Sequence, residues 1–417
     1  MSTGPINAEP TKELFIKTLI KDLSITEAIL DLIDNAIDGY QRHKYKDRKE
    51  IKLNIGKENF EIWDNCGGIS IDHAKHEVFR FGIVGERGKH SLGVYGIGLK
   101  RSMFKIGSDI TFESDDLTNY FRVKIDLEKW KNKPGWSHEF DELSESKGTT
   151  FTNLCITQLH DEIQAEFDSN TFKTELGYRV SKTYFLFMQE NVDIYLNTTK
   201  IEPLELQVGF SEEVEPANKY FEIDGVKIKL TAGAHPDYNN PGWYIFCNNR
   251  LIILGDTTSL TGWGDRGVPQ YHNKYNRFKG FAYLDSDDPR VLPWTTAKNG
   301  IDTDSTIYIA VLREMQAMTQ QYTSYMTKAY PTEPEETIGK RILGELQTKP
   351  VQEFKQDQNF KAREIPERPI FTTINYSKRR TDVDKLKKCM GNKTMSNREL
   401  GERTFEYYKE MECPDEE

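Results

Sequence analysis

The spacing of apolar residues predicts an amphipathic helix near the start of the chain. Apolar side chains recur every three or four residues from Ile25 to Ile37, which places them on one helical face. The opposite face carries a line of polar residues: Glu27, Asp31, Asn35 and Asp38. Such a line is usually a solvated surface. However, Asp31 and Asn35 lie one turn apart, which is also the geometry of a magnesium-nucleotide site.

Alternating apolar and polar residues predict a β-hairpin over residues 51–64, which ends at Asp64. The glycines Gly67 and Gly68 follow closely. A carboxylate here can accept a hydrogen bond from an exocyclic amine, and glycines let a flat base approach the backbone. An ordinary tight turn explains the same residues, so both interpretations stay open.

A glycine-rich segment precedes a second run of helical spacing. Gly93, Gly96 and Gly98 lie just before it, and Lys100 lies in its first turn. Backbone amides at a helix start form an anion site, to which the helix dipole and a lysine add positive potential. No strand leads directly into this segment, so a Rossmann dinucleotide site is disfavoured.

The chain as a whole is predicted to be an α+β protein in three parts. These are an α/β sandwich over residues 1–170, a second α/β domain over 171–330, and a charged extension over 331–417. Strands are expected at 109–126 and 148–157, and a helical run near 170–190 leads to a second set at 192–196, 220–230, 243–254 and 278–284. A long helix follows at 304–329. The extension has few apolar residues, which favours linker and short helices.

Composition limits the functional classes. The net charge of −10 means that the molecule as a whole does not attract nucleic acid, although residues 41–50 and 378–393 are locally basic. A solvated surface explains each basic segment as well. No apolar stretch approaches the ~18 residues of a membrane span, and five widely spaced cysteines disfavour a disulfide framework. We therefore expect a cytoplasmic protein without a membrane partner.

Four segments together resemble the ATP-binding motifs of the GHKL superfamily, which includes gyrase B, the ninety-kilodalton heat-shock chaperones, histidine kinases and MutL. They are the Asp-x-x-x-Asn helix, the strand ending at Asp64, the Gly-x-x-Gly-x-Gly loop and Lys147-Gly-Thr-Thr-Phe151. The sequences Asp-Leu-Ile-Asp-Asn-Ala and Gly-Val-Tyr-Gly-Ile-Gly-Leu-Lys are most similar to MORC-type ATPases. The resemblance covers about residues 12 to 330 and implies a GHKL (Bergerat) α/β sandwich followed by a transducer-like domain.

The resemblance also implies a role for each motif residue. Asn35 would bind Mg²⁺, Asp64 would read the adenine of ATP beside Gly68, and the phosphate-binding lid would contain Gly93, Gly96, Gly98 and Lys100. Thr149 and Thr150 would close the adenine pocket, although a β-strand explains a threonine run as well. In the second domain, residues 247–253 are similar to a strand carrying Asn-x-Arg, and Lys298 is the candidate for the lysine that reaches the γ-phosphate.

Two positions depart from the family pattern. The general base is normally Glu, and Asp31 occupies its position with a side chain one methylene shorter, so slow hydrolysis is expected. Glu27 is not its substitute, because Ser24-Ile-Thr-Glu27 is a capping-box pattern. Cys66 stands where the usual Asp-x-Gly-x-Gly pattern has its first glycine, so one glycine is moved by a residue. A place in the pocket lining and a small buried hydrophobe both explain Cys66, and the second is expected.

The resulting hypothesis is an ATP- and Mg²⁺-dependent conformational switch that closes as a nucleotide-dependent homodimer. The alternative is a nucleotide-sensing module that hydrolyses little and signals to a partner protein. Phosphotransfer to protein is disfavoured, because no His-bearing helix precedes the motifs. DNA, in genome maintenance or antiviral defence, is an expectation from the MORC and MutL likeness alone.

Overall fold

An eight-stranded sheet supports the predicted site. The computed structural model describes residues 11–43, 45, 47–82, 89–94, 96–204, 206–329, 345–364 and 372–413. In sheet order the strands are β5 (Glu142–Glu145), β4 (Asn119–Asp126), β3 (Gly107–Asp115), β6 (Phe151–Leu159), β2 (Asn59–Asp64), β1 (Lys49–Ile55), β7 (Val192–Leu196) and β8 (Thr199–Lys200). The predicted hairpin is confirmed, because β1 and β2 pair antiparallel from Ile51 opposite Asp64 to Ile55 opposite Phe60.

One strand of this sheet comes from a part of the chain that we expected elsewhere. Val192–Leu196 was predicted to start the second set of strands, and this is wrong: β7 pairs parallel with β1, with Lys49 opposite Val192 and Leu53 opposite Leu196. Its alternating pattern identifies a strand but not the neighbour of that strand. The first sheet therefore continues past residue 170 to β8.

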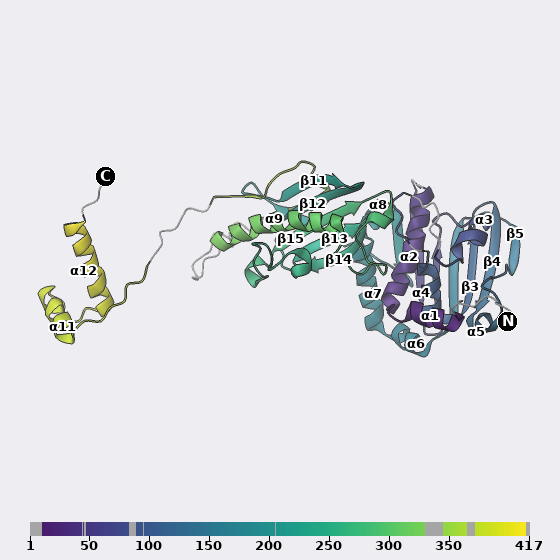
Figure 1. Cartoon of the computed structure of the whole chain (residues 1–417), viewed down its shortest axis with the longest axis horizontal. Helices are drawn as coiled ribbons and strands as arrows, with labels where there is room; N and C mark the ends of the chain where they lie inside the picture. The colour runs from purple at the N-terminus through teal and green to yellow at the C-terminus, as the bar shows by residue number, and fades with distance from the viewer. Residues whose placement is uncertain are drawn as a thin grey trace, which may run out of the picture. The chain divides into compact units, whose positions relative to one another are not determined.

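The predicted amphipathic helix is α2 (Ile25–His43), and its apolar face is buried from Ala28 onward, with Ile25 partly buried. Its start is a capping box, as predicted: the Ser24 N–H donates to Glu27 Oε2 at 3.1 Å, and the Glu27 N–H donates to Ser24 Oγ at 3.1 Å. Figure 1 shows α2 together with α1 and α4 against the sheet. The helices of this region are α1 (Lys12–Ile20), α3 (Ile71–His73), a π-helical turn (Ala74–Val78), α4 (Gly98–Ile106), α5 (Leu127–Asn132), α6 (Asp161–Asp168), α7 (Asn170–Thr183) and α8 (Phe185–Glu190).

A second lobe follows, built on a five-stranded sheet along which the long helix α9 (Thr306–Ala329) runs (Figure 1). Its strands in order are β11 (Ala217–Ile223), β12 (Val226–Ala234), β15 (Phe278–Asp285), β13 (Gly242–Cys247) and β14 (Arg250–Asp256). A two-residue turn, Asn248-Asn249, joins β13 to β14, and both residues have positive φ, 47° and 64°. Asparagine tolerates this conformation, which a tight hairpin needs. The predicted α+β class is confirmed.

The segment after α9 returns to the second lobe, which we did not predict. β16 (Gln347–Pro350) pairs with β9 (Gln207–Phe210), and β17 (Lys361–Ala362) pairs with β10 (Val214–Glu215). Val351 and Phe354 are buried in a cluster that includes Tyr244 and Phe246. The expectation of a linker is therefore wrong for residues 345–364, because a few apolar side chains and short edge pairings are enough to anchor a charged segment.

The chain divides into two compact units, residues 1–365 and 366–417. The second contains α11 (Arg380–Cys389) and α12 (Asn397–Glu412), with Met395 and Leu400 buried. These are the short helices expected for this region. In the parts of the chain that the structure describes, no helix is long and apolar enough to cross a membrane.

Candidate active site

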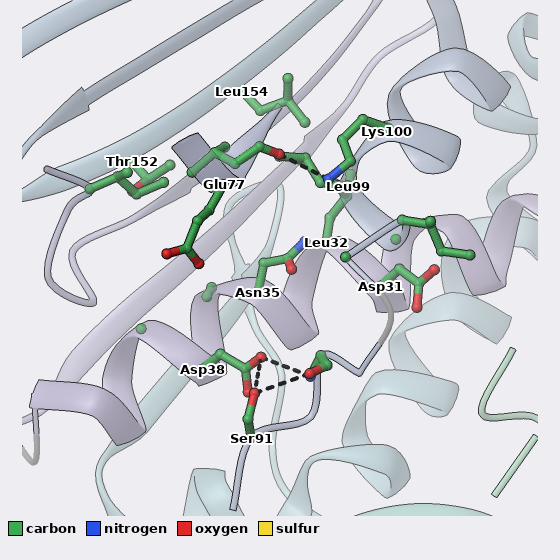
Figure 2. Close-up of a pocket in the computed structure, with 18 of the residues that line it drawn as sticks. Asp31, Leu32, Asn35, Asp38, Glu77, Ser91, Leu99, Lys100, Thr152 and Leu154 are labelled. Atoms are coloured by element: carbon green, nitrogen blue, oxygen red, sulfur yellow. Dashed lines mark hydrogen bonds between the residues drawn. The ribbon is translucent and has the colours of Figure 1, made fainter. Parts of the chain in front are cut away.

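A cavity of about 230 Å³ lies where α2, the glycine-rich segment, α4 and the strands β2 and β6 meet (Figure 2). The structure brings nearly all the predicted site residues to its wall: Asp31, Asn35, Asp64, Gly68, Gly93, Gly96, Gly98, Lys100 and Lys298. Thr149 and Thr150 are not among the described residues that line it. Part of the expected lid, residues 83–88, lies outside the described residues.

Thr152 and Leu154 lie where Thr149 and Thr150 were expected. Thr149 is exposed, and β6 begins only at Phe151. Thr152 lies directly opposite Asp64 in the antiparallel register of β2 and β6, and it lines the cavity together with Leu154. Side chains two residues apart share one face of a strand, so the start of β6 decides which threonine faces the cavity. The position of Asp64 in the neighbouring strand could have indicated this register.

Asp64 is a buried carboxyl at the end of β2, with 8% of its surface exposed. Burial raises its pKa to about 7, and the hydrogen bond donated by the Cys66 N–H at 2.9 Å offsets only part of that rise. Cys66 is buried, as expected, and it also lines the cavity. The carboxyl can therefore accept a hydrogen bond from a ligand in a dry pocket.

Gly68 is required by its backbone and by its surroundings. Its φ is +66°, and a Cβ at this position would lie 2.0 Å from the carbonyl oxygen of Asp115. No other residue type fits without moving the loop at Asp115. The glycine thus keeps the cavity wall beside Asp64 close to the neighbouring backbone.

Asn35 lies on the exposed side of α2, and Figure 2 shows its amide projecting into the cavity. Mg²⁺ prefers oxygen ligands and usually keeps several water molecules and substrate phosphates in its shell. An accessible amide oxygen beside the glycine-rich segment fits that requirement, so Asn35 is able to supply one protein ligand to a nucleotide-bound Mg²⁺.

Asp38 holds the start of the glycine-rich segment, a role that we did not predict. Its carboxylate accepts hydrogen bonds from the Leu92 N–H at 2.6 Å and the Gly93 N–H at 2.8 Å. It also accepts one from the Ser91 hydroxyl at 2.9 Å, which Figure 2 shows. Burial raises the pKa of Asp38 despite these bonds. The polar line of α2 included Asp38, but its partners lie more than fifty residues away in sequence.

The predicted phosphate-binding residues follow this anchor. Gly96 has φ +64°, and α4 begins at Gly98. Lys100 is buried in the first turn of α4, lines the cavity, and donates from Nζ to the Val78 carbonyl oxygen at 2.9 Å. A helix N-terminus with glycines before it is thus directed at the cavity.

Asp31 is held by two cations. Arg101 donates from Nε to Asp31 Oδ2 at 2.8 Å, and a terminal nitrogen of the same guanidinium lies 2.6 Å from that oxygen. Lys298 Nζ lies 3.6 Å from Asp31 Oδ1. Both Asp31 and Arg101 are buried. The carboxylate predicted to be the general base is therefore paired with cations in this structure.

Asp34, one residue before Asn35, ties α2 to the second lobe. It accepts hydrogen bonds from Lys298 Nζ at 2.6 Å, Tyr184 Oη at 2.7 Å and Arg250 Nε at 2.8 Å. Burial alone would raise its pKa, but attraction to Arg250 and Lys298, together with the bonds from Lys298 and Tyr184, outweighs burial and lowers it. We did not predict this role, although the Asn-x-Arg strand pointed to Arg250.

The second lobe also contacts the residues just before the glycine-rich segment. Asn248 Nδ2 donates to the Ser91 carbonyl oxygen at 3.4 Å, and Asp287 lies 2.6 Å from Lys89 Nζ and 3.2 Å from His90 Nε2. Lys298 itself has φ 53°, an uncommon conformation for a residue with a side chain. The second lobe is therefore bonded both to Asp31 and Asp34 on α2 and to residues 89–91.

One comparison with known proteins matches this region. A family model described as histidine kinase-, DNA gyrase B- and HSP90-like ATPase matches residues 23–158, from the capping box of α2 almost to the end of β6. No curated protein matches the chain. The matched residues contain Asp31, Asn35, Asp64 and the glycine-rich segment, whereas Lys298 and Arg250 lie beyond them.

Proposed function

We propose, on the premise that residues 23–158 form a GHKL-type ATPase domain, that the whole chain is an ATP-driven conformational switch. The adenine amine would donate to Asp64 beside Thr152, and the phosphates would lie at the N-terminus of α4. Asn35 would hold Mg²⁺, which supplies positive charge to the phosphates when it is bound.

One observation carries the switch. Lys298 comes from the second lobe, lines the cavity, and lies 2.6 Å from Asp34 and 3.6 Å from Asp31. A γ-phosphate in this cavity would compete with the two carboxylates for the lysine, whereas a diphosphate ends one group earlier. A ligand biases a conformational equilibrium only through its different affinity for the two states. Contact with Lys298 would let ATP, but not ADP, have a different affinity for the two states.

Asp31 is the proposed general base, and its pairing supports slow turnover. A carboxylate held by Arg101 and Lys298 must be released before it can accept a proton from water. We expect that Asp31→Asn abolishes turnover while nucleotide binding survives, and that Asp31→Glu turns over faster if the short side chain limits the rate. Wild-type turnover in Asp31→Asn would remove Asp31 from this role.

The second candidate is a nucleotide-sensing module without significant hydrolysis, and the same pairing of Asp31 favours it. Steady-state phosphate release separates the two candidates. A chain that binds ATP but releases no phosphate above the Asp31→Asn background is a sensor.

The switch is tested by its oligomeric state. We expect a non-hydrolysable ATP analogue to shift the chain toward a dimer in light scattering, ADP to leave it unshifted, and Lys298→Ala to remove the shift with little change in ADP affinity. Lys361→Ala is the matched control, because Lys361 is exposed and pairs with Glu215 away from the cavity. An analogue-bound wild type that stays monomeric at high micromolar concentration would refute the dimer clamp.

The client of the switch is a separate proposal. The motif likeness to MORC-type ATPases and MutL supports DNA, and the basic segment 378–393 supplies local positive charge, mostly on exposed side chains. DNA binding that weakens steeply with salt and depends on Lys385 and Lys388 would support it. Binding to a partner protein is the alternative.

A further inference from the structure

Arg101 is a buried cation on the cavity wall, and the roles described above give it a contact with Asp31 but none with the nucleotide. It lies in the first turn of α4, lines the cavity, and has 9% of its side chain exposed. Its Nε and one terminal nitrogen both contact Asp31 Oδ2. These contacts use one edge of the planar guanidinium, which has five donors. Among the described residues, no acceptor other than Asp31 is bonded to this side chain.

The Asp31 carboxylate occupies a position that favours an anion. A Cβ built on Gly98, the first residue of α4, would lie 3.3 Å from Asp31 Oδ2, so the carboxylate lies against the N-terminus of this helix. Partial positive charge of the helix end, the Arg101 guanidinium and Lys298 Nζ thus converge on one carboxylate. The same three features would bind a phosphate group, and the glycine-rich segment directs phosphates to this end of the cavity.

Two other aspartates of α2, near Asp31, are already engaged elsewhere. Asp34 is bonded to Lys298, Arg250 and Tyr184, and Asp38 accepts from the backbone at Leu92 and Gly93. Arg101 therefore has one anionic partner in the described chain, Asp31. An incoming γ-phosphate would have to compete with that single carboxylate.

We propose that Arg101 is a second ligand of the γ-phosphate, supplied by the ATPase domain itself and held by Asp31 when no triphosphate is bound. This role rests on the proposed function. When ATP enters, the guanidinium shares its donors with a γ-phosphate oxygen, which loosens its hold on Asp31 and lets that carboxylate accept a hydrogen bond from water. ADP cannot reach the guanidinium. The shorter Asp in place of Glu suits this arrangement, because it keeps the carboxylate back against α4 within reach of Arg101.

Nucleotide selectivity tests the proposal. Calorimetry would measure the dissociation constants of ADP and of a non-hydrolysable ATP analogue for the wild type, Arg101→Gln and Arg101→Lys. We expect Arg101→Gln to lose about tenfold or more in analogue affinity, since a hydrogen bond to a charged group is lost, and to keep ADP affinity within about twofold. Arg101→Lys keeps the positive charge but loses the planar guanidinium, so its affinity for the analogue should lie between those of the wild type and Arg101→Gln. Lys105→Gln on the same helix is the matched control, because Lys105 pairs with Glu162 outside the cavity wall.

Removing the Asp31 carboxylate, which competes with the γ-phosphate for Arg101, should change the affinity for the analogue in the opposite direction. Asp31→Asn frees Arg101 and should raise analogue affinity severalfold over ADP, and the double variant Asp31→Asn with Arg101→Gln should lose that gain. The double variant leaves no buried charge from this pair unbalanced, so it keeps the test usable if Arg101→Gln alone fails to fold. An Arg101→Gln variant with an unchanged ratio of analogue to ADP affinity, or an Asp31→Asn gain that survives in the double variant, would overturn the role of Arg101. A wild type that binds neither nucleotide would instead refute the ATP switch and, with it, this role.

Discussion

The substitution Asp64→Asn is expected to stabilise the nucleotide-free protein and to weaken its binding of ATP. The carboxyl is buried, and burial raises its pKa from an ordinary value of 3.8 to about 7. Between these two pH values the folded chain holds a proton that the unfolded chain has released. Stability therefore falls as the pH rises from about 4 to 7 and is lowest above 7.

The magnitude follows from the size of the shift. At about 1.36 kcal/mol for each tenfold change in acidity, the rise from 3.8 to about 7 costs up to roughly 4 kcal/mol at neutral pH. An amide at position 64 has no charge to bury and can still accept the hydrogen bond of the Cys66 N–H. The same amide can present a donor to the adenine amine, which leaves a mismatch worth about 1 to 3 kcal/mol in binding.

Two measurements check this reasoning together. Thermal unfolding should show Asp64→Asn more stable than the wild type at pH 8, with the difference shrinking as the pH falls toward 4. Calorimetry should show weaker ATP binding by the same variant. The control is Asp22→Asn, which changes an exposed carboxylate in the turn between α1 and α2. A variant that is less stable than the wild type at pH 8 would show that the buried carboxylate does not destabilise the fold. A variant that binds ATP normally would show that Asp64 is not the adenine acceptor.

Three further outcomes are expected. Gly68→Ala should weaken ATP binding and lower the free energy of unfolding by more than about 1 kcal/mol. Its control is Gly135→Ala, which also has positive φ but no atom within 4 Å of the added carbon, so it should cost only backbone strain. Equal losses of the two variants in thermal unfolding would argue against the Asp115 contact. Asp34→Ala should destabilise the chain by about 3 to 5 kcal/mol in denaturant unfolding, because it leaves buried Arg250 and Lys298 without this partner. The control is Asp288→Asn, which changes an exposed pair with Arg290 and should cost less than about 1 kcal/mol. Since the pKa of Asp34 is lowered, its contribution is present above pH 4 and lost as the pH falls further; an Asp34→Ala penalty that persists unchanged at pH 2 would contradict this. Asp287→Asn should speed hydrogen exchange at residues 89–92, and unchanged exchange would show that the pairs with Lys89 and His90 do not hold this segment.

The sequence predicted features that depend on local spacing. The interval of three and four residues identified α2 and placed Asp31 and Asn35 on its polar side, and the capping box at Ser24 identified its first residue. Glycines at fixed offsets identified the start of α4. In each case the physical cause, a helical period or a free backbone amide, acts over a few residues.

Features that depend on long-range pairing were missed. Asp34 resembles its neighbours on α2, and only the fold brings Tyr184, Arg250 and Lys298 to it from 150 to 264 residues away. Thr152 was missed because the strand was expected from residue 148, whereas β6 begins only at Phe151, so the residues that face the cavity lie further along the chain. The pairing of Arg101 with Asp31 was missed for the same reason, since sequence spacing does not show which cation reaches which carboxylate.

The parallel pairing of β7 with β1 has a consequence for how this protein can be made and divided. The residues that carry the family likeness end at 158, but β1 obtains its second neighbour only when residues 192–196 arrive. When only the first 160 residues have been synthesised, β1 is an open edge of the sheet, and Asp34 lacks its partner Tyr184. The segment that matches the family model and the folding unit are therefore different lengths of chain. An expression fragment that stops at residue 158 is expected to aggregate, whereas one that includes β7 keeps this edge covered.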